Sequence, residues 1–141
     1  MKSNSITQNQ YSSWILVTLR EAAWAPLSVF SVYLFCLIIG LYDLYPNLDI
    51  PTHILGGIAI TYFYRSAIRN SQELLGEIPF PIRVLFAFTC TGTTIIFWEF
   101  AENIVDFLFQ THNVFGLFDT LKDMFDGLLG ALILTLIFRR R

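Results

Sequence analysis

Acidic residues recur at helical spacing inside stretches that are otherwise apolar enough to cross a membrane. The three groups are Glu99, Glu102 and Asp106; Asp119, Asp123 and Asp126; and the pair Asp49 and His53. Neighbours within each group are three or four residues apart, so on a helix they would share one face. A carboxylate near the bilayer centre costs roughly 2.5–3.5 kcal/mol on insertion scales, and such residues therefore mark a functional site by default.

The rest of the chain has the composition of a membrane protein. Of its 141 residues, 55% are hydrophobic and only 14% are charged, and the mean hydropathy is +0.57. A soluble domain carries about 25% charged residues. The length suits a single transmembrane domain over residues 1–141. No basic patch with interleaved aromatic residues appears, so we expect no binding of nucleic acid.

Four apolar stretches are expected to cross the membrane. They cover about residues 22–42, 51–68, 82–109 and 119–138. A crossing helix needs about 20 predominantly apolar residues. Residues 1–21 are expected to form a polar tail and a short interfacial helix. The predicted fold is therefore all-α, an integral membrane four-helix bundle with a short N-terminal interfacial helix.

Small and positively charged residues extend this prediction. Glycines at 56, 57, 127 and 130 are small enough to permit close contacts between helices. The arginines lie before the first span, between the second and third spans, and after the fourth, which the positive-inside rule assigns to the cytoplasm. Both termini are then cytoplasmic, and the acidic groups fall in the outer half of the bundle. Lys122 alone departs from this pattern.

The acidic cluster needs compensation, because nearby like charges destabilise one another. A divalent metal ion would supply it: oxygen ligands suit Mg²⁺, Mn²⁺ or Ca²⁺, and a histidine also permits Zn²⁺ or Fe²⁺. Two alternatives stay open. Protonated carboxylates could bond to one another and to Asn103, or the cluster could be a solvated vestibule with no specific ligand.

The candidate residues follow from this chemistry. The expected metal ligands are His53, Glu99, Glu102, Asp106, Asp119, Asp123 and Asp126. Of these, Glu99, His53 and Asp126 are the expected catalytic residues, and the identity of the metal is left open. No glycine-rich phosphate loop, GxSxG elbow or HExxH helix is present. Acid–base or metal-activated water chemistry is therefore the remaining catalytic class.

The order of these motifs resembles a known family. An Asp-x-x-x-His pair precedes two glycines, then comes the Glu-rich segment 98–106, and last the Asp-rich segment 119–131. The pattern resembles the YjdF-like family of small uncharacterised bacterial and archaeal membrane proteins and is more distantly similar to the VanZ-like family. The resemblance covers about residues 45–135 and implies an integral protein of a bacterial or archaeal inner membrane. It supports the choice of site residues and implies no particular reaction.

Three functions are consistent with these residues. The first is a metal-dependent membrane enzyme acting on a lipid or lipid-linked substrate, by phosphoester hydrolysis or transfer at the outer leaflet. The second is an ion- or proton-coupled carrier, because intramembrane carboxylates also form proton relays. A carrier of this size would need to dimerise, which makes a homodimer a candidate assembly. The third is a non-catalytic accessory protein stabilised by a bound cation.

Overall fold

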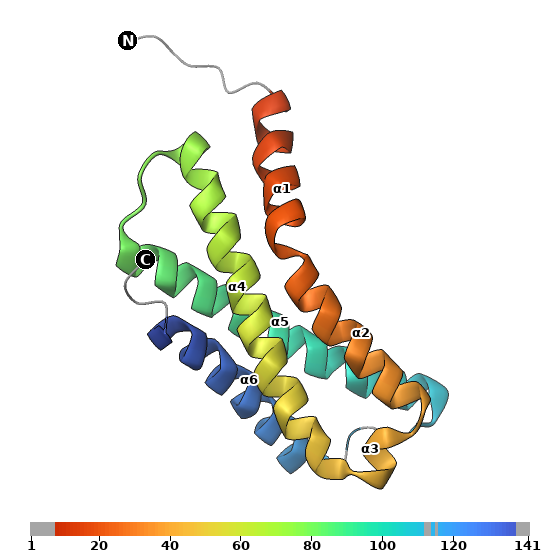
Figure 1. The fold of residues 1–141 in the computed structure, drawn as a ribbon. Coiled ribbons are helices and arrows are strands. Elements are labelled where there is room, and N and C mark those ends of the chain that lie inside the picture. Colours follow the sequence, from red (N-terminus) through yellow and green to blue (C-terminus); the bar gives the residue numbers. More distant parts are fainter. Residues whose placement is uncertain (1–7, 112–113, 115, 138–141) are drawn as a thin grey trace, which may run out of the picture.

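All the regular secondary structure in the described part of the chain is helical, as the all-α prediction requires. The computed structural model describes residues 8–111, 114 and 116–137 and contains no strand among them. The helices are α1 Gln8–Ala22, α2 Trp24–Ile38, α3 Leu41–Leu44, α4 Asp49–Leu75, α5 Phe80–Phe109 and α6 Leu117–Ile137, with a 3₁₀ turn η1 at Pro46–Leu48 (Figure 1). The last three helices occupy the stretches expected as the second, third and fourth spans.

The first expected span, residues 22–42, does not form one straight helix. The chain bends by 50° between Ser13–Ala22 and Trp24–Ile38. Pro26 explains the bend, because a proline ring clashes with the carbonyl four residues earlier, here that of Ala22. The helix then ends at Ile38, and Gly40 adopts a left-handed conformation with φ 67° that favours glycine. Helix α1, where a short interfacial helix was expected, covers Gln8–Ala22 and is followed by α2 after one residue.

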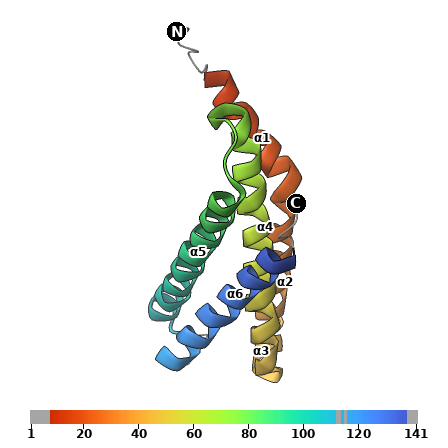
Figure 2. The ribbon, with the colours of Figure 1, turned by 90° about the vertical axis from the view of Figure 1, so that its left-hand side faces the viewer.

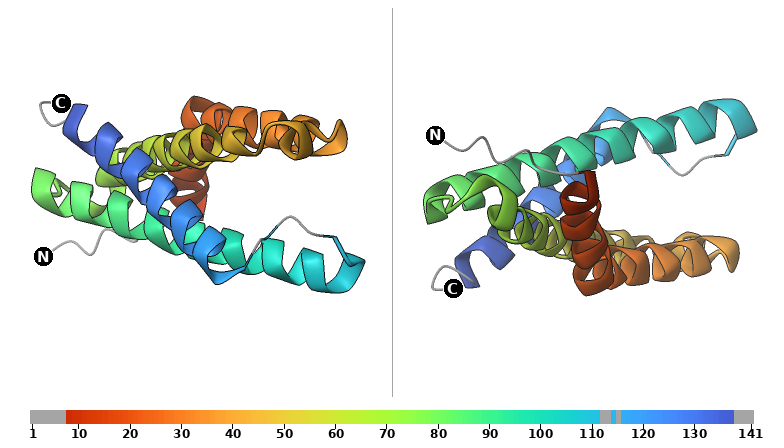
Figure 3. Two further views of the ribbon diagram at one scale, coloured as in Figure 1. Left: turned by 90° about the horizontal axis from the view of Figure 1, so that it is seen from below. Right: turned by 90° about the horizontal axis from the view of Figure 1, so that it is seen from above.

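Helix α4 is the central element of the bundle. It contacts α1 and α2 on one side and α5 and α6 on the other (Figure 1). Helices α4 and α5 diverge, and α6 crosses from the end of α5 to α4 (Figure 2). The α3 turn and the C-terminal end of α5 lie at one end of the molecule, whereas the α4–α5 linker lies at the other (Figure 3). The two ends carry the features described below.

Glycines bring α4 and α6 into backbone contact. A Cβ atom on Gly57 would collide with the carbonyl oxygen of Gly127, and one on Gly130 would collide with the carbonyl oxygen of Ile54. Small residues of this kind let the backbones of membrane helices approach closely. Gly56 was also expected to permit a close contact between helices, but it does not lie at one, because a Cβ atom there would meet nothing within 4 Å.

The distribution of buried and exposed side chains is the reverse of that in a soluble protein. The buried residues are mostly small or polar, such as Ala131, Thr61 and Thr91, whereas many large apolar side chains on every long helix are exposed. Among the described residues, α5 alone is long and apolar enough to cross a membrane, and the bent pair α1–α2 could form a second, broken span. The four-span arrangement therefore stays a prediction.

Candidate functional site

The acidic groups of three helices converge on His53. Its Nε2 lies 3.1 Å from Asp49 Oδ1 on α4 and 4.0 Å from Asp123 Oδ1 on α6. Its Nδ1 lies 3.9 Å from Glu99 Oε1 on α5. The two ring nitrogens thus face two different sets of carboxylates, which divides the cluster into two halves.

A lysine binds both carboxylates of the first half, which is formed by Asp49, His53 and Asp123, and offsets one of their two negative charges. One ligand atom from each of the three residues lies within 4.8 Å of the others. Lys122 Nζ donates hydrogen bonds to Asp49 Oδ2 at 3.0 Å and to Asp123 Oδ1 at 2.6 Å. Asp49 precedes the apolar stretch that begins at Pro51. Burial alone would raise the pKa of its carboxyl, but the hydrogen bonds from His53 and Lys122 hold that pKa well below its usual range.

The second half, formed by His53, Glu99 and Glu102, has no such cation among the described residues. Its ligand atoms again lie within 4.8 Å of one another. Glu99 is only 3% exposed, and both of its carboxylate oxygens are buried without a hydrogen-bond partner in the described part of the chain. Glu102 is better satisfied, because Tyr33 donates a hydrogen bond of 2.7 Å to its Oε1. A buried carboxylate without a partner is costly, so this half is the better candidate for a bound cation.

The distance between His53 and Glu99 suits a shared ligand. At 3.9 Å, Nδ1 and Oε1 are too far apart for a direct hydrogen bond. Two ligand atoms that each lie about 2.1 Å from one tetrahedral metal ion are about 3.4 Å apart, so a closer approach of about half an ångström would give this pair the spacing of shared ligands. With Asp49 accepting a hydrogen bond from Nε2, the Nδ1 lone pair would face Glu99. This is the arrangement of a carboxylate–histidine–metal triad.

Three expected ligands lie outside both halves. Asp106 accepts hydrogen bonds from Thr111 Oγ1 at 2.6 Å and from the backbone N–H of Val114 at 2.8 Å, so it holds the loop after α5. Asp119 and Asp126 each approach Lys122 Nζ at 4.0 Å. Asp126 is nevertheless buried, and its Oδ2 has no hydrogen-bond partner among the described residues, which keeps it a candidate for proton transfer.

Two further expectations concern polar neighbours. Asn103 was one possible hydrogen-bond partner of protonated carboxylates, but its Nδ2 donates instead to the backbone oxygen of Glu99 at 2.8 Å. His112, a weaker candidate from the sequence, lies outside the described residues. The alternative of carboxyl groups hydrogen-bonded through Asn103 therefore receives no support from these contacts.

Sequence reasoning did not include three of the residues that shape the site. Asp49 and Lys122 stood out by spacing and by charge, but neither was expected to be a site residue. Tyr33 gave no signal, because it contacts Glu102 across a separation of 69 residues. The packing of α2 against α4, with Tyr33 in contact with Trp98 of α5, places this hydroxyl at the cluster.

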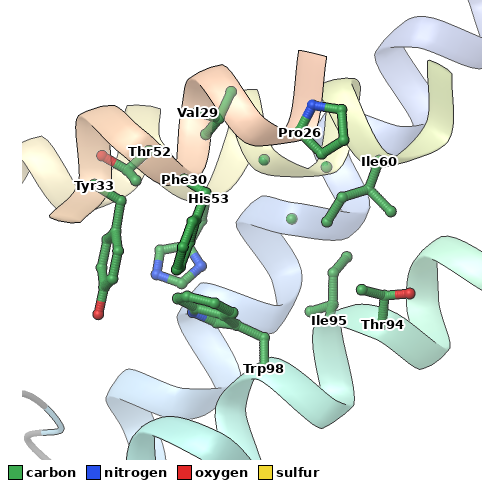
Figure 4. Close-up of a pocket in the computed structure, with 13 residues that line it drawn as sticks. Pro26, Val29, Phe30, Tyr33, Thr52, His53, Ile60, Thr94, Ile95 and Trp98 are labelled. Carbon is green, nitrogen blue, oxygen red and sulfur yellow. The ribbon is translucent and has the colours of Figure 1, made fainter. Parts of the chain in front are cut away.

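An apolar cavity of about 250 Å³ adjoins the cluster at His53 (Figure 4). It lies between α2, α4 and α5, with Gly127 of α6 also contributing. The ring of Trp98 meets Tyr33 and Phe30 edge-on, at centroid distances of 5.2 and 5.8 Å. His53 thus lies where an acidic cluster meets an aromatic-walled apolar cavity.

Comparison with known proteins agrees with the motif pattern. A family model described as "Predicted membrane protein (DUF2238)" matches residues 12–141. The match confirms the resemblance to the YjdF-like family of small uncharacterised membrane proteins. No curated protein and no solved structure matches the chain.

Proposed function

Because the chain belongs to this family of predicted membrane proteins, we propose that it is a divalent-metal-dependent membrane enzyme acting on a lipid or lipid-linked phosphoester. One observation carries the proposal. The carboxylate of Glu99 is buried, lacks a hydrogen-bond partner among the described residues, and faces His53 beside an apolar cavity. A metal ion would compensate this charge and would stand where a lipid could reach it.

His53, Glu99 and Glu102 would hold the metal. Asp49 would orient the imidazole through Nε2, and Tyr33 would orient Glu102 through its hydroxyl. The metal would be a hard cation, since two of its three protein ligands are carboxylates. Three protein ligands leave positions for a water molecule and a substrate oxygen, as catalytic sites require.

The cavity suggests the substrate class. Its aromatic and aliphatic walls suit an acyl or polyprenyl chain, and the phosphoester would then lie at the metal next to His53. A bound metal would polarise the phosphoryl oxygen and lower the pKa of an attacking water. Asp126 is our choice for the base that takes the proton from that water, because its Oδ2 is buried and accepts no hydrogen bond from the described residues, with Lys122 Nζ 4.0 Å away.

The proposal includes the membrane arrangement. In it, α4, α5, α6 and the bent pair α1–α2 form a four-span bundle whose exposed large apolar side chains face lipid. The arginines of the α4–α5 end would face the cytoplasm, and the acidic cluster would open toward the outer leaflet.

An activity assay in detergent tests this function. The purified chain, loaded with Mn²⁺, would be incubated with phosphatidic acid and with a polyprenyl monophosphate, and released phosphate would be measured. We expect release that stops with chelator and is lost in Glu99→Gln. Metal binding without phosphate release from either substrate would favour the accessory protein with a structural cation.

One observation favours a proton-coupled carrier as the second candidate. Thr61 and Thr91 are fully buried and hydrogen-bonded to each other at 3.0 Å, which places a polar pair inside the bundle beyond the cluster. Such a pair could relay protons between the two ends of the molecule. In liposomes with a pH gradient, proton flux that is lost in Thr61→Val, with no phosphate release, would select the carrier.

A further inference from the structure

A second cavity lies at the opposite end of the bundle from the acidic cluster. It has a volume of about 290 Å³, is formed by α4, α5 and α6, and is lined by Arg65, Arg69 and Arg83. We propose that this cavity binds a phosphate-bearing anion, with the headgroup of an anionic lipid as its source. The proposal does not depend on the function of the acidic cluster.

The charge of this cavity is one-sided. The described residues that line it include no aspartate or glutamate. Arg69 is already paired outside the cavity, since its guanidinium lies 2.9 Å from Glu21 on α1. Arg65 of α4 and Arg83 of α5 bring guanidinium groups from two helices to the same cavity. An anion between α4 and α5 would reduce the repulsion between these two cations.

Arg83 is the residue most clearly prepared for such a ligand. Its Nε is buried and has no hydrogen-bond partner among the described residues. Its guanidinium carbon lies 5.7 Å from the centroid of the Phe80 ring, a cation–π distance that holds the group in place. A guanidinium fixed in this way offers paired N–H donors that match the oxygens of a phosphate.

The other walls favour a lipid over a free ion. Tyr62, Ile68, Val84 and Leu134 line the same cavity as the arginines. A phosphate on the guanidinium groups would therefore lie beside an apolar surface that suits the glycerol and first methylenes of a lipid. Arg65 follows His53 along α4 by about 18 Å, at about 1.5 Å per residue, which separates this pocket from the acidic site.

Lipid binding to the full chain tests the proposal. Native mass spectrometry and thermal melts would be run in neutral detergent with phosphatidylglycerol, with phosphatidylcholine, or with inorganic phosphate. We expect phosphatidylglycerol to be retained and to raise the melting temperature more than phosphatidylcholine does. Arg83→Gln should weaken that binding about tenfold or more, because it removes a charged donor, and Arg83→Lys should weaken it less.

The matched control is Arg20→Gln. Arg20 is an exposed arginine on α1 that does not line the cavity, so this variant should bind phosphatidylglycerol like the wild type. Saturation by inorganic phosphate alone, lost in Arg83→Gln, would support the phosphate site and identify a free anion as its source. Equal binding of phosphatidylglycerol by wild type and a folded Arg83→Gln would overturn the proposal.

Discussion

At the scale of single residues, the two nitrogens of His53 have different environments. Nε2 contacts Asp49, whose other oxygen is bound by Lys122, whereas Nδ1 faces the carboxylate of Glu99, which accepts no hydrogen bond from the described residues. The lysine supplies the cation for one half of the cluster, and the other half has none among the described residues. We therefore propose that a metal would bind beside Nδ1 and that Asp49 would orient the ring.

The first prediction concerns Asp49. Replacing it with alanine removes the acceptor at Nε2, so the imidazole loses its fixed orientation and metal affinity should fall about ten- to hundredfold. Titration of the purified chain with Mn²⁺, followed by electron paramagnetic resonance, measures the affinity.

The matched control is Asp43→Ala, because Asp43 is an exposed acid in the preceding α3 turn. It should bind Mn²⁺ like the wild type. Equal affinities for Asp49→Ala and wild type would show that Asp49 does not orient the metal ligand.

At the scale of helices, the crossing of α4 and α6 sets the geometry of the cluster. Gly57 of α4 lies against the backbone of Gly127, and Gly127 is followed along α6 by Gly130, which lies against Ile54. This contact fixes the distance between His53 on one helix and Asp123 on the other. A small change in the crossing angle of α4 and α6 would therefore change the distance between the side chains of His53 and Asp123.

The second prediction compares the adjacent glycines of α4. Gly57→Ala should destabilise the fold by about 1–3 kcal/mol or more, because its methyl group collides with backbone that cannot move aside. Gly56→Ala should leave stability nearly unchanged, since nothing lies within 4 Å of the added carbon. Thermal melts of both variants make the comparison, and equal melting temperatures would mean that the close contact does not exist.

The sequence predicted the helices well where apolar length and polar spacing agreed. Helices α5 and α6 begin and end within about two residues of the expected spans, because prolines and a loop limit them. The prediction was wrong where apolar composition and helical spacing do not reveal the end of a helix or a contact between distant residues. The stretch 22–42 reads as one apolar segment, yet α2 ends at Ile38 and a separate turn follows Gly40, and the contact of Tyr33 with Glu102 is a tertiary one that spacing does not reveal. Likewise, helical spacing put Asp106 with Glu102, but loop contacts engage its carboxylate.

At the scale of the whole molecule, the two ends have opposite chemistry. Acidic residues and His53 gather at the end of the α3 turn, and arginines line a cavity at the end of the α4–α5 linker. Between them, small buried residues hold the helices together while large apolar side chains cover the outside. A molecule with one acidic end, one basic end and an apolar outer surface fits a bilayer whose two faces differ in electrostatic potential.

The third prediction concerns orientation. If the arginine-lined end faces the cytoplasm, a reporter fused to the C-terminus should give a cytoplasmic signal, because α6 ends on the same side as the α4–α5 linker. A reporter inserted at Gly76, in that linker, should give the same signal. Reporters that reveal the C-terminus outside would contradict the orientation of the acidic site.

The central claim is that the half-cluster of His53, Glu99 and Glu102 binds a divalent cation, and metal stoichiometry tests it most directly. Purified protein would be dialysed against Mn²⁺ and analysed by elemental mass spectrometry, alongside Glu99→Gln and, as a control outside both halves, Asp119→Asn. The account predicts one ion per chain for the wild type and Asp119→Asn, and none for Glu99→Gln. The Glu99→Gln protein should melt in chelator no lower than wild type, because it lacks an uncompensated buried charge. A wild type without stoichiometric metal, or a Glu99→Gln variant that keeps it, would contradict the account.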